Sequence, residues 1–127
     1  MNRILIVGAG GFVGAVMRYG LGALIAGIAG ESSLPYPTLI VNVIGCFLIG
    51  LLAYFAEGVA GLTNEMYLLL MVGLLGAFTT YSTFSYEAMS LLMSNRVGFA
   101  LLHIGLHILA GLTAVWLGRV VAIGIFR

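Results

Sequence analysis

The chain has 127 residues, 62% of them hydrophobic and only 7% charged, whereas a soluble domain usually carries about a quarter charged residues. A net charge of +1 with no basic run excludes a nucleic-acid-binding surface. Each membrane crossing needs about 20 apolar residues, so residues 1–127 have no room for a soluble catalytic domain, and we expect a single all-α domain of four crossings in a lipid bilayer.

The first expected membrane helix covers residues 4–26, an apolar segment interrupted only by Arg18. A guanidinium inside a membrane is costly and marks a pathway, unless the long side chain reaches back to the interface; both interpretations of Arg18 remain open. Small residues allow helices to approach closely in lipid. Four small residues share a face with Arg18: Gly8, Gly11, Ala15 and Gly22. Gly10 and Gly14 form a separate pair with the GxxxG spacing. We expect these glycines to pack against other helices.

A polar turn with Pro35 and Pro37 precedes the second expected helix, residues 38–56. One face of this helix carries small and polar side chains: Thr38, Asn42, Gly45, Cys46 and Ile49. A membrane asparagine such as Asn42 often only joins helices by hydrogen bonds, and a pore-lining role is an equal alternative. Cys46 is the only cysteine and cannot form an intrachain disulfide, so we expect it to be an inert packing residue.

After a loop at residues 57–65, the third expected segment covers residues 66–93. Its middle, Gly73–Ser85, combines glycine with a cluster of hydroxyl side chains, which is unusual for a helix that faces lipid. Irregular backbone at membrane depth survives only inside protein or beside a watery cavity, and broken helices expose backbone groups that bind ions. We predict a break near residues 76–80; the alternative is a continuous helix whose small residues pack closely.

The turn at residues 94–96 leads into the fourth expected helix, residues 97–125, which has His103 and His107 on one stripe with small residues. Histidines four residues apart can bind a metal ion, but no carboxylate or cysteine nearby completes a site. Two interpretations remain: neutral histidines hydrogen-bonded inside the bundle, or a polar lining of a water-filled vestibule.

The arginines give only a weak preference for one orientation in the membrane. Four crossings put both termini on one side, where Arg3, Arg119 and Arg127 outnumber Arg18 and Arg96 on the other side. Because lysine and arginine counts set orientation, this small difference permits insertion in both directions and hence an antiparallel homodimer.

Enzymatic functions find no support in the motifs. The chain has no Ser-His-Asp set, paired carboxylates, nucleotide loop or metal motif. Residues 8–14 resemble a dinucleotide fingerprint by eye, but they lack the preceding strand and the later acidic residue. We therefore expect the protein not to be an enzyme.

Three motifs together resemble the Fluc (CrcB-type) fluoride channels over nearly the whole chain. The most specific is Gly73-Leu-Leu-Gly-Ala-Phe-Thr-Thr-Tyr-Ser-Thr-Phe-Ser85, supported by Gly14–Tyr19 and Thr38–Gly45. The resemblance implies a passive, fluoride-selective channel in the bacterial inner membrane that exports the ion and relieves fluoride toxicity. It also implies an antiparallel, dual-topology homodimer with two pores and a structural Na⁺ at its centre.

The resemblance also assigns roles to residues of this chain. Backbone carbonyls of Gly76 and Thr79 are implied as the Na⁺ ligands. The implied fluoride pore is lined by Asn42, Tyr81, Phe84, Ser82 and Thr83, and the implied vestibule and polar track by Arg18, His103 and His107. Ala77 stands where the family has a second glycine, and Tyr81 where it has phenylalanine. We expect both histidines to line the pore near its mouth.

Two other functions compete with the channel. A small four-helix, dual-topology multidrug or cation antiporter needs a carboxylate within the membrane, and we expect Glu87 to lie toward the end of the third segment instead. The second alternative is an accessory subunit that transports nothing, but this function does not explain why Thr and Ser side chains cluster in the middle of the third segment. The sequence does not say whether a paralogous partner subunit is needed.

Overall fold

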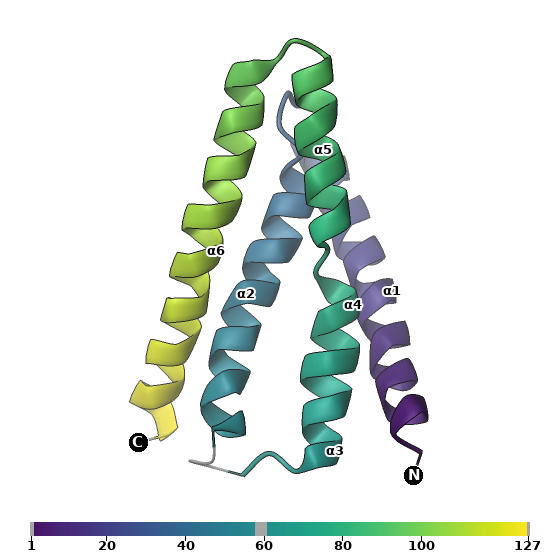
Figure 1. The fold of residues 1–127 in the computed structure, drawn as a ribbon, viewed down its shortest axis with the longest axis vertical. Coiled ribbons are helices and arrows are strands. Elements are labelled where there is room, and N and C mark those ends of the chain that lie inside the picture. The colour runs from purple at the N-terminus through teal and green to yellow at the C-terminus, as the bar shows by residue number, and fades with distance from the viewer. Residues whose placement is uncertain (1, 58–60, 127) are drawn as a thin grey trace.

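The computed structural model describes residues 2–57 and 61–126, and every regular element within them is helical. Four segments are long and apolar enough to cross a membrane, so the protein is a multi-pass membrane protein (Figure 1). In chain order the elements are α1 (Arg3–Ala29), α2 (Tyr36–Ala56), α3 (Asn64–Tyr67), the π-helix η1 (Leu68–Leu75), α4 (Gly76–Phe78), α5 (Tyr81–Met93) and α6 (Val97–Phe126). Residues 58–60 of the expected loop, and Arg127 of the orientation argument, lie outside the described residues.

Three of the membrane segments begin one or two residues before the expected start, and the first and fourth end after the expected residue. Pro37 lies in the first turn of α2, where its missing N–H leaves no hydrogen bond unmade, so the helix includes residues that we expected in the turn. The third segment starts at Asn64 because the Thr63 side chain accepts a hydrogen bond from the Met66 amide, at 3.2 Å.

Glycines bring the helices into backbone contact in two places. Gly50 of α2 faces the carbonyl of Val115, and Gly118 of α6 faces the carbonyl of Phe47, so a Cβ at either glycine would collide with backbone. On α1, the GxxxG pair Gly10 and Gly14 packs in the same way, against the carbonyls of Leu69 and Leu74. The expected packing role of this pair is therefore confirmed.

The other predicted glycine face of α1 does not pack. Among the described residues nothing lies within 4 Å of a Cβ built on Gly8 or Gly22, and Gly11 makes only ordinary contacts. Within the described part of this chain Gly8 and Gly22 therefore meet no other helix, and their packing against helices of another copy stays a prediction. Small residues on α1 form two faces: Gly10 and Gly14 press against the backbone of the third segment, whereas the other face meets that segment only loosely, at Gly11.

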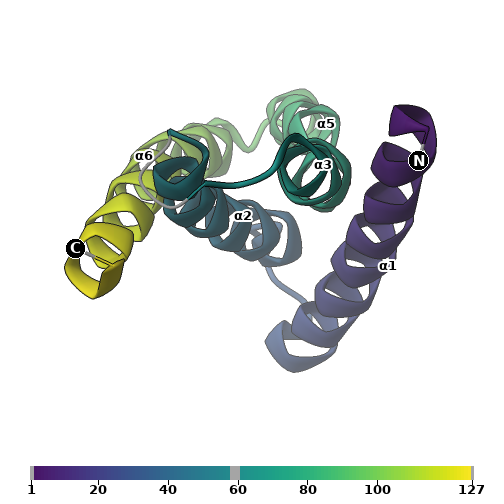
Figure 2. The same cartoon turned by 90° about the horizontal axis from the view of Figure 1, so that it is seen from below.

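The third segment is broken at midspan, within the predicted interval. Thr79 and Thr80 have extended backbone (ψ of 157° and 113°), and α5 begins at the next residue. The π-helix η1 precedes the break, and π-helices are rare and often lie at functional sites. Viewed along the bundle, α2 and this divided segment lie between α1 and α6 (Figure 2).

The buried core is small and adjoins the break. Val41, Leu75 and Phe78 are each at most 2% exposed. Large apolar side chains elsewhere point outward on every long helix; Phe12, Ile28, Leu109 and Trp116 are examples. Extensive apolar exposure is unfavourable in water, and it suits a chain surrounded by lipid.

Candidate functional site

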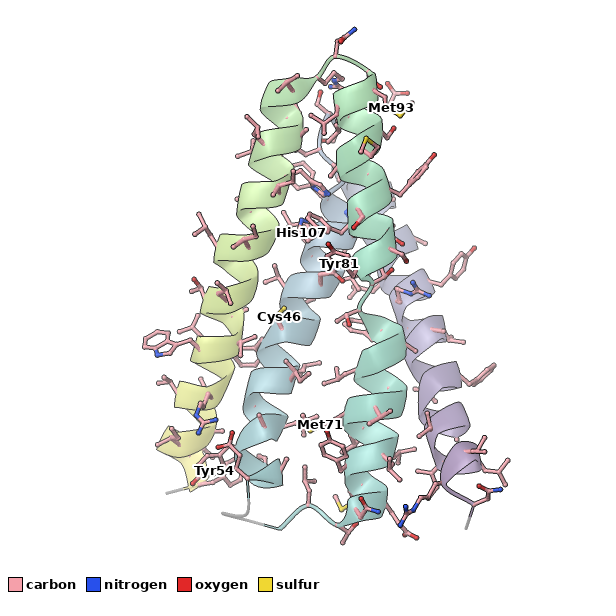
Figure 3. All side chains as sticks on the ribbon, viewed as in Figure 1. Cys46, Tyr54, Met71, Tyr81, Met93 and His107 are labelled. Atoms are coloured by element: carbon pink, nitrogen blue, oxygen red, sulfur yellow. The ribbon has the colours of Figure 1, made fainter. Side chains whose placement is uncertain are left out.

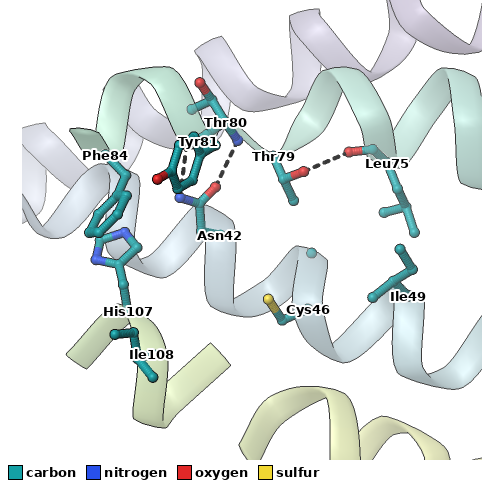
Figure 4. A pocket seen from close by; sticks show the side chains of 11 residues that line it. Asn42, Cys46, Ile49, Leu75, Thr79, Thr80, Tyr81, Phe84, His107 and Ile108 are labelled. Carbon is teal, nitrogen blue, oxygen red and sulfur yellow. Dashed lines mark hydrogen bonds between the residues drawn. The ribbon is translucent and has the colours of Figure 1, made fainter. Parts of the chain in front are cut away.

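Asn42 holds the broken backbone from the neighbouring helix. Its Oδ1 accepts a hydrogen bond from the Thr80 amide at 2.9 Å, and its Nδ2 donates to the Thr80 carbonyl at 3.2 Å (Figure 4). The side-chain amide thus supplies the donor and acceptor that a continuous helix would have given Thr80. Asn42 joins two helices, and its second Nδ2 hydrogen remains available to the cavity beside it.

The carbonyl oxygens of Gly76 and Thr79 are among those that lose their helical partners at the break. In a continuous helix the Gly76 carbonyl would accept from the Thr80 amide, but that amide donates to Asn42. The Thr79 carbonyl would accept from the Thr83 amide, which instead donates to the Thr80 hydroxyl at 3.3 Å. Gly76 and Thr79 are the two residues implied as Na⁺ ligands, and carbonyl oxygen is a suitable ligand for a hard cation. The donor set therefore fits a small cation.

A cavity of about 360 Å³ lies between α2, α5 and α6, next to the break. Asn42, Thr79, Tyr81, Phe84 and His107 are among its lining residues. The rings of Tyr81 and Phe84 lie 5.7 Å apart between centroids, and Phe84 lies 4.4 Å from the His107 ring. Figure 3 shows Tyr81 of α5 and His107 of α6 at a similar height in the bundle, with Cys46 of α2 below them. The described lining carries no formally charged side chain.

The expected pore residues Ser82 and Thr83 do not line this cavity. Their hydroxyls lie 3.2 Å and 3.1 Å from the Thr80 hydroxyl, so they stabilise the start of α5. Thr83 lines a second cavity of about 250 Å³, together with Arg18, Thr38 and Thr80. Because Thr80 lines both cavities, the break is the wall that they share.

Arg18 points into the bundle rather than only along its surface, because it lines the second cavity with residues of α2 and α5. Among the described residues no carboxylate lies within 4.0 Å of its guanidinium. Thr38 and Thr83 give this cavity hydroxyl groups as well. This position favours the pathway interpretation of Arg18, since its charge is available to attract an anion.

The two histidines have different surroundings. His103 is 1% exposed, and its Nε2 lies 3.4 Å from Oε2 of Glu87. His107 lines the larger cavity, and its Nδ1 lies 3.0 Å from the His103 carbonyl. The structure thus places His107 at the cavity and His103 against Glu87, and that both line a pore near its mouth stays a prediction. No group of three His, Cys, Asp or Glu side chains in the described chain could hold a metal ion.

Glu87 lies toward the end of the third segment, as expected, since α5 ends at Met93, but its side chain faces the other helices. It is 19% exposed, and its Oε1 accepts a hydrogen bond from the Thr38 hydroxyl at 2.5 Å. The carboxylate therefore packs within the bundle, which the sequence analysis did not predict. Spacing could have shown this, since Glu87 follows the aromatic residue Phe84 by three positions and shares its face.

Comparison with known proteins is consistent with this architecture. The model of the family described as CrcB-like protein, Camphor Resistance (CrcB), matches residues 5–119. The relative named fluoride-specific ion channel FluC 1 of Methanosarcina acetivorans is 41% identical, over 98% of this chain and 94% of the relative. A fluoride-specific ion channel FluC of Thermus thermophilus is 47% identical over 93% of each chain. That of Methanococcus aeolicus is 38% identical over the full length of both.

These relatives are named as ion channels and not as enzymes, and they cover the chain almost end to end. The family match includes all four membrane segments and the break. The chain therefore belongs to the CrcB-like protein family.

Proposed function

We propose that the protein is a passive, fluoride-selective channel that lets fluoride leave the cell and so relieves its toxicity. The observation that carries the proposal is the uncharged cavity at the Asn42–Thr80 contact, lined by the rings of Tyr81 and Phe84. The full-length similarity to proteins named as fluoride-specific channels supports the choice of ion.

The lining suits a small anion that gives up part of its water shell. Aromatic rings have a positive edge, and the free Nδ2 hydrogen of Asn42 is a neutral donor. Conduction requires several weak sites in place of one tight site, and neutral donors with ring edges provide weak sites. Arg18, in the adjoining cavity, raises the local anion concentration.

We also infer an antiparallel homodimer with two pores. In the single chain Tyr81 is 80% exposed and Gly76 is exposed at midspan. Freed carbonyls facing hydrocarbon would be unfavourable, so a second copy covering this face is a physical requirement of the proposal. The weak arginine asymmetry supports an inverted orientation of that copy.

A structural Na⁺ at the dimer centre is part of the same proposal. The carbonyls of Gly76 and Thr79, which lose their amides at the break, would hold it. Bound there, the ion supplies positive charge for carbonyl dipoles that have no N–H partner. We place the channel in the cytoplasmic membrane, which is the inner membrane of bacteria that have two.

Fluoride efflux from proteoliposomes loaded with potassium fluoride tests the function, with valinomycin as the trigger. We expect fast fluoride release and no release of chloride from matched vesicles. A well-folded protein that releases no fluoride would disprove the channel.

Topology has its own test. Labelling an Asn95→Cys variant, in a Cys46→Ser background, should reach the α5–α6 turn from both sides of the membrane. Labelling from one side only would contradict the antiparallel dimer.

A proton-coupled cation antiporter is the second candidate, because Glu87 lies inside the bundle beside His103. Such a carrier would exchange protons for an organic cation through this carboxylate, independently of fluoride. Uptake of a cationic dye driven by a pH gradient, and abolished in Glu87→Gln, would support it. Fluoride efflux that needs no proton gradient would favour the channel.

A further inference from the structure

We propose that His107 is a proton-dependent fluoride site, whose ring binds the anion only together with a proton taken from the water phase. This inference rests on the proposed fluoride channel and concerns the same cavity. The ligand is fluoride plus a proton, held as an imidazolium–fluoride pair.

The hydrogen bond of His107 fixes its neutral form. Nδ1 lies 3.0 Å from the His103 carbonyl oxygen, and a carbonyl oxygen can only accept. The bond therefore assigns the single ring hydrogen of the neutral imidazole to Nδ1. Nε2 is then left with a lone pair and can only accept hydrogen bonds.

That lone pair has no partner. Nε2 of His107 is buried and makes no hydrogen bond within the described chain, although the residue lines the cavity beside Phe84. Fluoride also only accepts hydrogen bonds, so it is repelled by a neutral His107. Adding a proton turns Nε2 into a charged N–H donor, which is the partner that fluoride needs.

The other titratable groups around His107 do not supply this charge. On α6 and α5, His103 and Glu87 face each other at 3.4 Å, so a proton on His103 makes an internal ion pair. Tyr81 of α5 and Cys46 of α2 also line the cavity, and they offer it a phenol and a thiol rather than a cationic group. The fluoride ion itself is therefore the counter-ion of a protonated His107.

The proton and the fluoride ion should bind to His107 cooperatively, because their charges neutralise each other. A lone charge is costly in a buried site, and a pair formed there removes part of that cost. By linkage, fluoride favours proton uptake by the ring as much as the proton favours fluoride binding. Lower pH should therefore increase fluoride flux through the site.

The first experiment measures fluoride efflux between about pH 8 and pH 6 in wild type, His107→Gln and His103→Gln. Wild-type efflux should rise by up to about tenfold per pH unit while the ring is mostly neutral, since the protonated fraction follows the proton concentration. His107→Gln should lose this dependence because its amide donates at every pH, and His103→Gln should keep it. Protein-free vesicles give the background from HF crossing the lipid.

The outcomes separate the two proposals. If none of the three proteins releases fluoride, the channel itself is wrong. If all conduct, an unchanged pH dependence in His107→Gln, or its loss in His103→Gln, overturns the role of His107.

A second measurement requires no transport. Ring ¹⁵N NMR of the protein in bilayers should show an unprotonated Nε2 for His107 at about pH 8, the signal being identified by its absence in His107→Gln. Sodium fluoride at mildly acidic pH should convert it to imidazolium, and sodium chloride should not. A protonated Nε2 in the neutral ring, or equal effects of both salts, would refute the site.

Discussion

Helix α2 makes two contacts of opposite kind along its length. Its C-terminal half meets α6 at Gly50 and Gly118, where backbone lies against backbone and no side chain fits between. Its N-terminal half holds the third segment through side chains, Asn42 to Thr80 and Thr38 to Glu87. Cavities lie beside the second contact. The glycine contact holds α2 and α6 close together, whereas the polar contact positions hydrogen-bonding side chains of α2 and the third segment beside the two cavities.

Breaking the glycine contact should have the largest effect on stability. In Gly118→Leu the new side chain meets the Phe47 carbonyl, so the helices must separate; overpacking costs about 1–3 kcal/mol or more. We expect a lower melting temperature in detergent and little folded protein. The matched control is Gly124→Leu on the same helix, where a Cβ meets nothing within 4 Å among the described residues. Equal stability of the two variants would contradict the glycine contact.

Breaking the polar contact should affect function more than folding. Asn42→Ala removes the side-chain partner of the Thr80 N–H and C=O, but Thr80 lines both cavities. Water can take the place of the amide there, so the loss of stability should be smaller than in Gly118→Leu. We expect fluoride efflux to fall by at least about tenfold, because the broken backbone is no longer held in place beside the cavity; a tenfold fall corresponds to about 1.4 kcal/mol in the barrier. Ser94→Ala is the control: it removes a hydroxyl bond to the Ser90 carbonyl, which the Ser94 amide also contacts, at the exposed end of α5. An Asn42→Ala variant with normal fluoride efflux would show that the Asn42–Thr80 contact is not needed for conduction.

The aromatic lining should give an intermediate effect that sharpens the role of the cavity. Phe84→Leu removes a ring edge worth about 1 kcal/mol, or roughly fivefold in efflux rate. Tyr81→Phe keeps the ring and should change efflux by less than about twofold, unless the hydroxyl itself binds the ion. A larger loss of fluoride efflux in Tyr81→Phe than in Phe84→Leu would indicate that the Tyr81 hydroxyl, and not the ring edges, binds the ion.

The smallest effect is expected at Glu57, whose carboxylate makes two hydrogen bonds to Arg119 at the glycine-packed end of α2 and α6 (2.8 and 2.6 Å). These bonds hold the pKa of Glu57 below its ordinary value of 4.5. A folded pKa below the unfolded one adds stability above pH 4.5, and the gain is lost as the pH falls through the folded pKa.

Solvent screens this exposed pair, so the gain is small. The melting temperatures of wild type and Glu57→Gln should differ slightly near neutral pH and converge in acid. Glu31→Gln, which removes an exposed carboxylate outside any described ion pair, is the control. A difference that persists in acid would point to a packing effect of the substitution.

The sequence predicted the four crossings and the break, because charges lie at the segment ends and the hydroxyl cluster stands out in an apolar segment. It could not choose between the two small-residue faces of α1, since either Gly10 or Gly8 satisfies the same spacing. The position of Glu87 toward the end of the third segment was predicted, but its contacts with Thr38 and His103 were not, because position along the chain does not say which neighbouring helix a side chain faces. The π-helix changes which side chains share a face without altering composition, so hydropathy did not reveal it.

The Asn42–Thr80 contact lies within one chain, and this has a consequence for biogenesis. Each newly inserted copy can therefore form the Asn42–Thr80 contact by itself. If the chain assembles as the proposed antiparallel dimer, assembly needs only the encounter of two folded copies, with no refolding of the broken segment at membrane depth.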